Sequence, residues 1–219
     1  MLNRLPPVAK GLLIANAVAF LLQVLLGRMV FAPLMLWPLG GDAHPFLAGA
    51  PGFAPWQLLS YGFLHGNLAH LLFNMLALVM FGSQLEYTWG PRRFLAFFLV
   101  CVAGAGLCQL LVASWSVAQG AMPYPTVGAS GGVFGLLLAY GMLFPHQRVM
   151  LLIPPIPMKA RTLVIVYGAI ELYLGITGTQ SGVAHFAHLG GMLFGWLLIR
   201  YWRGQPPFGR GRGRGARRF

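Results

Sequence analysis

A serine and a histidine that could act together stand in two apolar segments of the sequence. Ser130 lies in the run GASGG, and His188 lies in the run AHLGG. A serine hydroxyl is a weak nucleophile until a base removes its proton, and a neutral imidazole can be that base near pH 7. Because the sequence has no acid close to either run, a Ser–His dyad for acyl transfer fits better than a triad.

A third polar run could stabilise the negative charge that acyl transfer develops on oxygen. His70 and Asn74 are four residues apart and share one face of a helix. Their side chains, together with the backbone N–H of Ser130, are candidate donors to that oxygen. Gly131 and Gly132 would let the chain turn tightly and leave the serine approachable.

Two histidines, His185 and His188, compete for the role of base. Gly191 and Gly195 follow His188 by three and seven residues, so they lie on its side of a helix. Small residues let neighbouring membrane helices approach closely. The serine run has small residues to match them, Gly131 and Gly135. We therefore expect His188 rather than His185 to face the serine.

The composition places these residues in a membrane protein. The 219 residues are 58% hydrophobic and 8% charged, whereas soluble domains carry about 25% charged residues. A soluble enzyme and a disordered chain are therefore excluded. The single aspartate, Asp42, excludes an intramembrane protease built on two aspartates, and no HExxH motif indicates a zinc protease. Cys101 and Cys108 would lie about 10 Å apart along a helix, too far for a disulfide.

Apolar stretches long enough to cross a bilayer recur along the chain. A helical span needs roughly 20 residues, and we predict six of them, at 9–29, 57–82, 93–114, 129–145, 160–178 and 183–202. The expected fold class is an all-α, six-helix membrane bundle over residues 1–202, followed by a disordered Arg/Gly-rich tail over 203–219. Counted from the inner ends of their spans, His70, Ser130 and His188 all lie about 20 Å up, at one level.

The basic residues predict the orientation of the spans. With both termini on the inner side, every lysine and arginine except Arg28 also falls on that side, which is the pattern of inner loops. We assign the net charge of +12 to this topology and to attraction to anionic lipid, and we expect no nucleic acid as a partner. The nearly uncharged loop 30–56, rich in aromatic residues, is expected to lie in the outer membrane interface.

The three runs, taken together and in this order, resemble those of the rhomboid family of intramembrane serine proteases. They read HGNLAHLLFNM, GASGGVFG and AHLGGMLFG, and the resemblance covers about 55–200. The segment Leu151–Ala160 also looks like that of bacterial six-helix members. One departure is the first outer loop, where many members carry a Trp-Arg pair and Trp37 here is followed by Pro38.

The resemblance implies a role for each polar residue. Ser130 matches the nucleophile, His188 the base, and His70 and Asn74 the oxyanion donors. Phe134 matches an aromatic residue, often a tyrosine, that packs against the catalytic imidazole. The supporting glycines of the motifs are Gly128, Gly131, Gly191 and Gly195.

The resemblance also implies a substrate class and a location. Family members cleave transmembrane segments of other membrane proteins near the outer face, without metal or cofactor. The expected location is the inner (plasma) membrane of a bacterium, with several passes and both termini in the cytoplasm. The fifth span and the loop after it match the substrate gate of the family.

Three other functions stay open at this point. The first is an inactive rhomboid-like protein that binds membrane helices, although such a protein would be expected to lack the serine or the histidine. The second is a small transporter. The third is a metal or haem site, with ligands drawn from His70, His185 and His188 and from Met75 or Met192.

Two further titratable residues carry weaker expectations. His65 is expected at the membrane interface. Glu171 is the one carboxylate that we place within a predicted span, and we expect it to pair with a backbone group or with Tyr167 or Tyr173.

Overall fold

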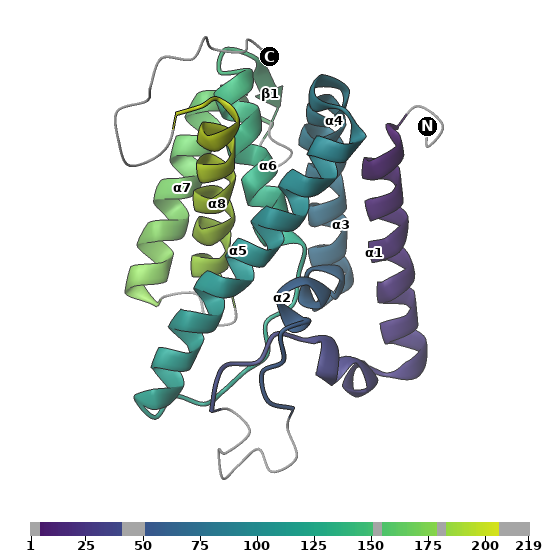
Figure 1. The fold of residues 1–219 in the computed structure, drawn as a ribbon, viewed down its shortest axis with the longest axis vertical. Coiled ribbons are helices and arrows are strands. Elements are labelled where there is room, and N and C mark those ends of the chain that lie inside the picture. Colours follow the sequence, from purple (N-terminus) through teal and green to yellow (C-terminus); the bar gives the residue numbers. More distant parts are fainter. Residues whose placement is uncertain (1–4, 41–50, 151–154, 179–182, 206–219) are drawn as a thin grey trace.

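The chain folds into a bundle of helices with one small hairpin (Figure 1). The computed structural model describes residues 5–40, 51–150, 155–178 and 183–205. The long helices are α1 (Pro7–Leu26), α3 (Leu68–Ala77), α5 (Pro91–Ala118), α6 (Ser130–Leu143), α7 (Ala160–Thr177) and α8 (His185–Trp202). The shorter elements are η2 (Arg28–Leu34), α2 (Gln57–Ser60), η4 (Tyr61–Phe63), η5 (Leu78–Gly82), α4 (Ser83–Trp89), β1 (Arg148–Met150) and β2 (Pro157–Lys159).

Four helical stretches in the described part of the chain are long and apolar enough to cross a membrane. They are Pro7–Leu26, Leu68–Trp89, Pro91–Ala118 and Ala160–Thr177. Helix α6 is apolar but has only 14 residues, and α8, which carries two histidines and an arginine, is not among the four. The predicted all-α, multi-pass membrane fold is confirmed, and the number of six spans stays a prediction.

The bounds of the second span differ from the prediction, which was 57–82, whereas the structure has Leu68–Trp89. Residues 57–63 form separate short helices, and the chain is non-helical until Asn67. The Asn67 side chain accepts a hydrogen bond from the His70 N–H at 2.8 Å and so caps the N-terminus of α3. Through η5, one turn of π-helix, the span continues to Trp89. The spacing of charged residues does not reveal this cap, because the uncharged stretch between Asp42 and Glu86 continues across it.

The hairpin is an exception to the all-α prediction. Strands β1 and β2 pair antiparallel, with Arg148 opposite Lys159 and Met150 opposite Pro157. The segment between α6 and α7 is rich in proline, which cannot continue a helix. The predicted disordered tail lies almost entirely outside the described residues.

Helix α5 lies at the centre of the bundle. It packs most extensively on α8 and also contacts α6 and α2, and its Phe94, Phe97 and Phe98 are fully buried. Helices α1 and α7 flank the bundle on opposite sides (Figure 1), and both expose long runs of apolar side chains. Neither cysteine on α5 forms a disulfide, as predicted.

Polar side chains tie the outer segments to this core. The first outer loop is held by Gln57, which accepts a hydrogen bond from the Trp37 N–H and donates to the Pro33 and Gly52 carbonyls. Trp37 is buried, and its indole N–H donates to Ala32. The described part of the loop therefore packs on the bundle. Its expected position in the membrane interface stays a prediction.

Helix α1 is anchored at both ends. Near its start, the Glu86 carboxylate accepts the N–H groups of Val8 at 2.9 Å and Ala9 at 2.7 Å. These amides have no partner within their own helix, and a negative charge is favoured at a helix N-terminus. Further along, the Gln23 amide exchanges two hydrogen bonds with the backbone of His65.

We predict that Glu86→Gln destabilises the protein by about 2 kcal/mol, the usual contribution of hydrogen bonds to a charged group. Thermal or denaturant unfolding in detergent measures the change. The control is Thr88→Ala, at an exposed position of α4, the helix that carries Glu86. This variant should unfold like the parent. Equal stability of Glu86→Gln and the parent would contradict this account of how α1 is anchored.

Candidate active site

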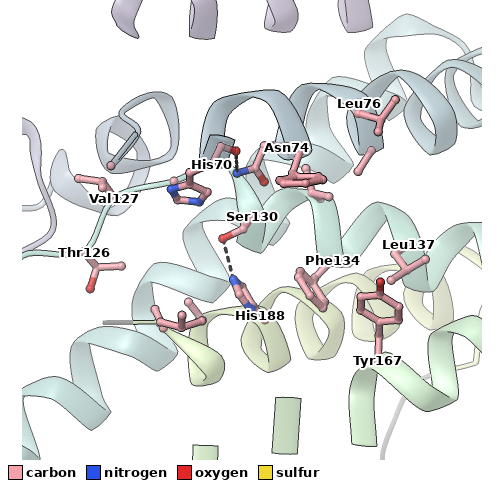
Figure 2. Close-up of a pocket in the computed structure, with 18 of the residues that line it drawn as sticks. His70, Asn74, Leu76, Thr126, Val127, Ser130, Phe134, Leu137, Tyr167 and His188 are labelled. Atoms are coloured by element: carbon pink, nitrogen blue, oxygen red, sulfur yellow. Dashed lines mark hydrogen bonds between the residues drawn. The ribbon is translucent and has the colours of Figure 1, made fainter. Parts of the chain in front are cut away.

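The three polar runs of the sequence meet at one cavity. The cavity has a volume of about 850 Å³ and is lined by α3, α6, α7, α8 and the segment that precedes α6. Figure 2 shows His70 and Asn74 on α3, across from Ser130 on α6 and His188 on α8. The structure thus brings together all four residues that the sequence singled out.

Ser130 and His188 are in direct contact. The serine Oγ lies 2.8 Å from the imidazole Nε2, a hydrogen-bond distance (Figure 2). Both residues stand in the first turn of their helices, and α6 and α8 begin at the same end of the bundle (Figure 1). With the proton of the ring on Nδ1, Nε2 accepts the hydroxyl proton, which is the arrangement that activates a serine.

Phe134 fixes the plane of this imidazole. It follows Ser130 by one helical turn, and its ring stacks on His188 with the centroids 4.2 Å apart and the planes at 5°. The stacking that the resemblance implied is therefore present.

Glycines let α6 and α8 approach closely enough for this contact. A β-carbon at Gly191 would collide with the carbonyl oxygen of Gly131. One turn further on, a β-carbon at Gly195 would lie 3.5 Å from the Cα of Gly135. The prediction that these two glycine faces meet is confirmed, and with it the choice of His188 over His185 as the neighbour of the serine.

His70 and Asn74 lie on the opposite wall of the cavity. Gly128 has a φ of +136°, and a β-carbon there would lie 2.7 Å from His70 Cε1, so only glycine lets the His70 ring lie against the chain that leads to Ser130. The Asn74 amide donates one N–H to the His70 carbonyl at 2.9 Å, which leaves its second N–H for a ligand.

Glu171 lies on α7, within the predicted fifth span, but its partners differ from those predicted. Its Oε2 is 2.7 Å from His185 Nδ1 and 2.9 Å from His188 Nδ1. The first contact has the geometry of a hydrogen bond, whereas the second is at ion-pair distance but misaligned for one. The predicted pairing with a tyrosine or a backbone group is wrong. No acid is close to either run in the sequence, but the fold brings this carboxylate beside His188. The sequence holds no signal for it, because Glu171 is on another helix whose rotation the sequence leaves open.

This cluster also bears on the metal hypothesis. Within the described ranges, the donor atoms of Glu171, His185 and His188 lie within 4.8 Å of one another, and two imidazoles with one carboxylate form a set that zinc accepts. His70, which the hypothesis included, is not part of this group. A metal ion is not needed to explain this grouping, because both imidazoles contact the same carboxylate oxygen, Glu171 Oε2.

His65 is fully buried within the protein, and its expected depth at the membrane interface stays a prediction. Its ring meets that of His70 edge-on, with the centroids 5.1 Å apart. It therefore packs directly against one wall of the cavity.

Comparisons with known proteins give one consistent result. The family model described as "Rhomboid domain" matches residues 53–204. RHOMBOID-like protein 4 of Arabidopsis thaliana is 34% identical over 75% of this chain and 38% of its own length. Rhomboid protein 1, mitochondrial, of Saccharomyces cerevisiae is 30% identical over 66% of this chain and 42% of its own length. Rhomboid protease GluP of Bacillus subtilis is 32% identical over 65% of this chain and 25% of its own length. The chain spans between a quarter and about half of the length of such relatives.

We predict that Gly191→Ala destabilises the protein by about 1–3 kcal/mol, the usual cost of overpacking, because the new methyl group forces α8 away from α6. Unfolding in detergent measures the effect. The control is Gly168→Ala on α7, where a β-carbon would meet only the Met192 side chain, at 3.5 Å from Cε and 3.9 Å from Sδ. This variant should be as stable as the parent or slightly more so, since alanine favours helices. Equal effects of the two substitutions would contradict a specific contact at Gly191.

Proposed function

This chain belongs to the rhomboid family, and from that premise we propose that it is an intramembrane serine endopeptidase with Ser130 as nucleophile and His188 as base. The observation that carries the proposal is the 2.8 Å contact between Ser130 Oγ and His188 Nε2 at the wall of a cavity. One relative, GluP of Bacillus subtilis, is named a rhomboid protease, which supports the same activity. An inactive helix-binding member would not need this contact.

In the proposed reaction, Ser130 Oγ attacks the carbonyl carbon of a peptide bond. His188 Nε2 takes the hydroxyl proton and then donates it to the leaving amine. The resulting acyl-enzyme is hydrolysed by a water molecule, with His188 again acting as base and Ser130 regaining its proton. No step requires a metal or a cofactor.

Donors for the oxyanion would come from both walls of the cavity. The side chains of His70 and Asn74 approach from α3, and the Ser130 N–H points out of the first turn of α6. N–H groups in the first turn of a helix have no partner within it, so this amide is free to stabilise developing negative charge.

The cavity wall fits an apolar substrate. Besides the polar residues, it is lined by large apolar side chains, among them Phe73, Leu76, Met80, Leu137 and Leu163. We propose that the substrate is a locally unwound transmembrane segment of another membrane protein, cleaved near the outer face.

The protein is a multi-pass membrane protein, and we propose the bacterial inner membrane as its location, with both termini in the cytoplasm. The starts of α1, α5 and α7 and the end of α8 lie at one end of the bundle (Figure 1). Basic residues gather near these points, among them Lys10, Arg92, Arg93, Arg161 and Arg203. This supports the orientation. The relatives come from a plant, a yeast mitochondrion and a bacterium, so the choice of a bacterial membrane depends on the sequence resemblance alone.

We predict that the protein in detergent reacts covalently with a fluorescent fluorophosphonate, and that Ser130→Ala and His188→Ala react at least about 100-fold more slowly, because each lacks half of the activated pair. In-gel fluorescence measures the labelling rate. His146→Ala, an exposed histidine, is the matched control and should label like the parent. Cleavage of a model transmembrane substrate in liposomes gives the second readout. A folded parent that neither labels nor cleaves would favour the helix-binding alternative.

We predict that Asn74→Ala lowers kcat by about 100-fold and that His70→Ala has an effect of similar size, since each substitution removes one donor to the oxyanion. KM should change little, because the donors act mainly in the transition state. Cleavage kinetics on a model transmembrane substrate measure both constants. A rise in KM with an unchanged kcat would instead assign these residues to substrate binding.

A further inference from the structure

The buried carboxylate on α7 has no part in the proposed dyad. Glu171 is only 8% exposed, on a helix whose exposed side chains are mostly apolar. An ionisable group within a membrane span is costly unless it has partners. Its partners here are two imidazoles, and one of them belongs to the proposed base.

The His188 ring lies between this carboxylate and the serine. Its Nδ1 is 2.9 Å from Glu171 Oε2, and its Nε2 is 2.8 Å from Ser130 Oγ. Although the contact at Nδ1 is not aligned as a hydrogen bond, a carboxylate oxygen so close to Nδ1 repels the lone pair of an unprotonated nitrogen. It therefore favours the tautomer that carries the proton on Nδ1, and this leaves the Nε2 lone pair for the serine proton. The same negative charge stabilises the imidazolium that forms when the proton arrives.

His185 holds the carboxylate in this place. Its Nδ1 makes the better aligned contact, at 2.7 Å, to the same Oε2 atom. His185 precedes His188 by three residues, so both rings reach Glu171 from one face of α8. The carboxylate is thereby fixed to α8 by one histidine and available to the other.

We propose that Glu171 is a positioning residue of this site, as the third member of a Ser130–His188–Glu171 triad. It keeps His188 in the Nδ1–H tautomer and balances the charge that His188 gains from the serine, while His185 holds it in place. The proton moves only between Ser130 Oγ and His188 Nε2, and Glu171 stays ionised. The proposal rests on the proposed protease function.

The test compares kcat and KM for Glu171→Gln and Glu171→Asp with the parent, together with their fluorophosphonate labelling rates. Glu171→Gln keeps the size of the side chain but loses its charge, and we expect kcat to fall about 100-fold with KM almost unchanged. Glu171→Asp keeps the charge and should recover part of the loss. Glu86→Gln is the matched control, because it neutralises a buried carboxylate bound to α1 rather than to the histidines. It should keep the parental kcat.

A direct measurement of the tautomer covers the case in which the Glu171 variants do not fold. Nitrogen NMR of the parent protein with 15N-labelled histidine, assigned with His188→Gln, should show His188 protonated on Nδ1. In a folded Glu171→Gln variant this preference should weaken.

The outcomes separate this proposal from the proposed function. If the parent cleaves and labels but Glu171→Gln retains more than about a tenth of the parental kcat, the proposed triad is wrong and the Ser–His pair alone accounts for the activity. A parental His188 with its proton on Nε2 would also contradict the triad. If the parent neither cleaves nor labels, the protease function itself is wrong.

Discussion

The site depends on the close approach of α6 and α8. The proposed nucleophile and the proposed base stand on different helices, so the distance between the helix axes decides whether they touch. At Gly191 the backbone of α8 lies so close to the Gly131 carbonyl of α6 that no β-carbon fits between the two helices. In a bilayer, where apolar side chains gain nothing by leaving lipid, this kind of close packing is the main source of helix association. The small residues that hold the bundle together are thus the residues that bring Ser130 to His188.

The remaining helices hold this pair in a defined setting. Phe134 stacks on the imidazole and fixes its plane, and α3 brings His70 and Asn74 to the other side of the cavity. The cap at Asn67 sets where α3 begins. Polar side chains away from the cavity, such as Glu86 and Gln57, are bound to backbone groups of outer segments. Because unpaired polar groups are expensive at membrane depth, these bonds make the position of each segment specific.

Glu171 differs from these structural groups. It joins α7 to α8 through two histidines and so brings a carboxylate beside His188, the proposed base. In the proposed triad the carboxylate can act only while α7 packs against α8. The composition of the site therefore depends on a third helix as well as on the contact of α6 with α8.

The sequence by itself determined the fold class, the family resemblance and the residues that meet at the cavity. Long apolar runs can be buried only in lipid, and the glycines beside Ser130 and His188 indicate which helix faces meet. The sequence did not determine where the second span begins, because the cap at Asn67 depends on one side-chain hydrogen bond within a long uncharged stretch. Nor could it place Glu171, since hydropathy does not fix the rotation of a helix about its axis. Only the tertiary structure decided which side chain on α7 reaches the imidazole.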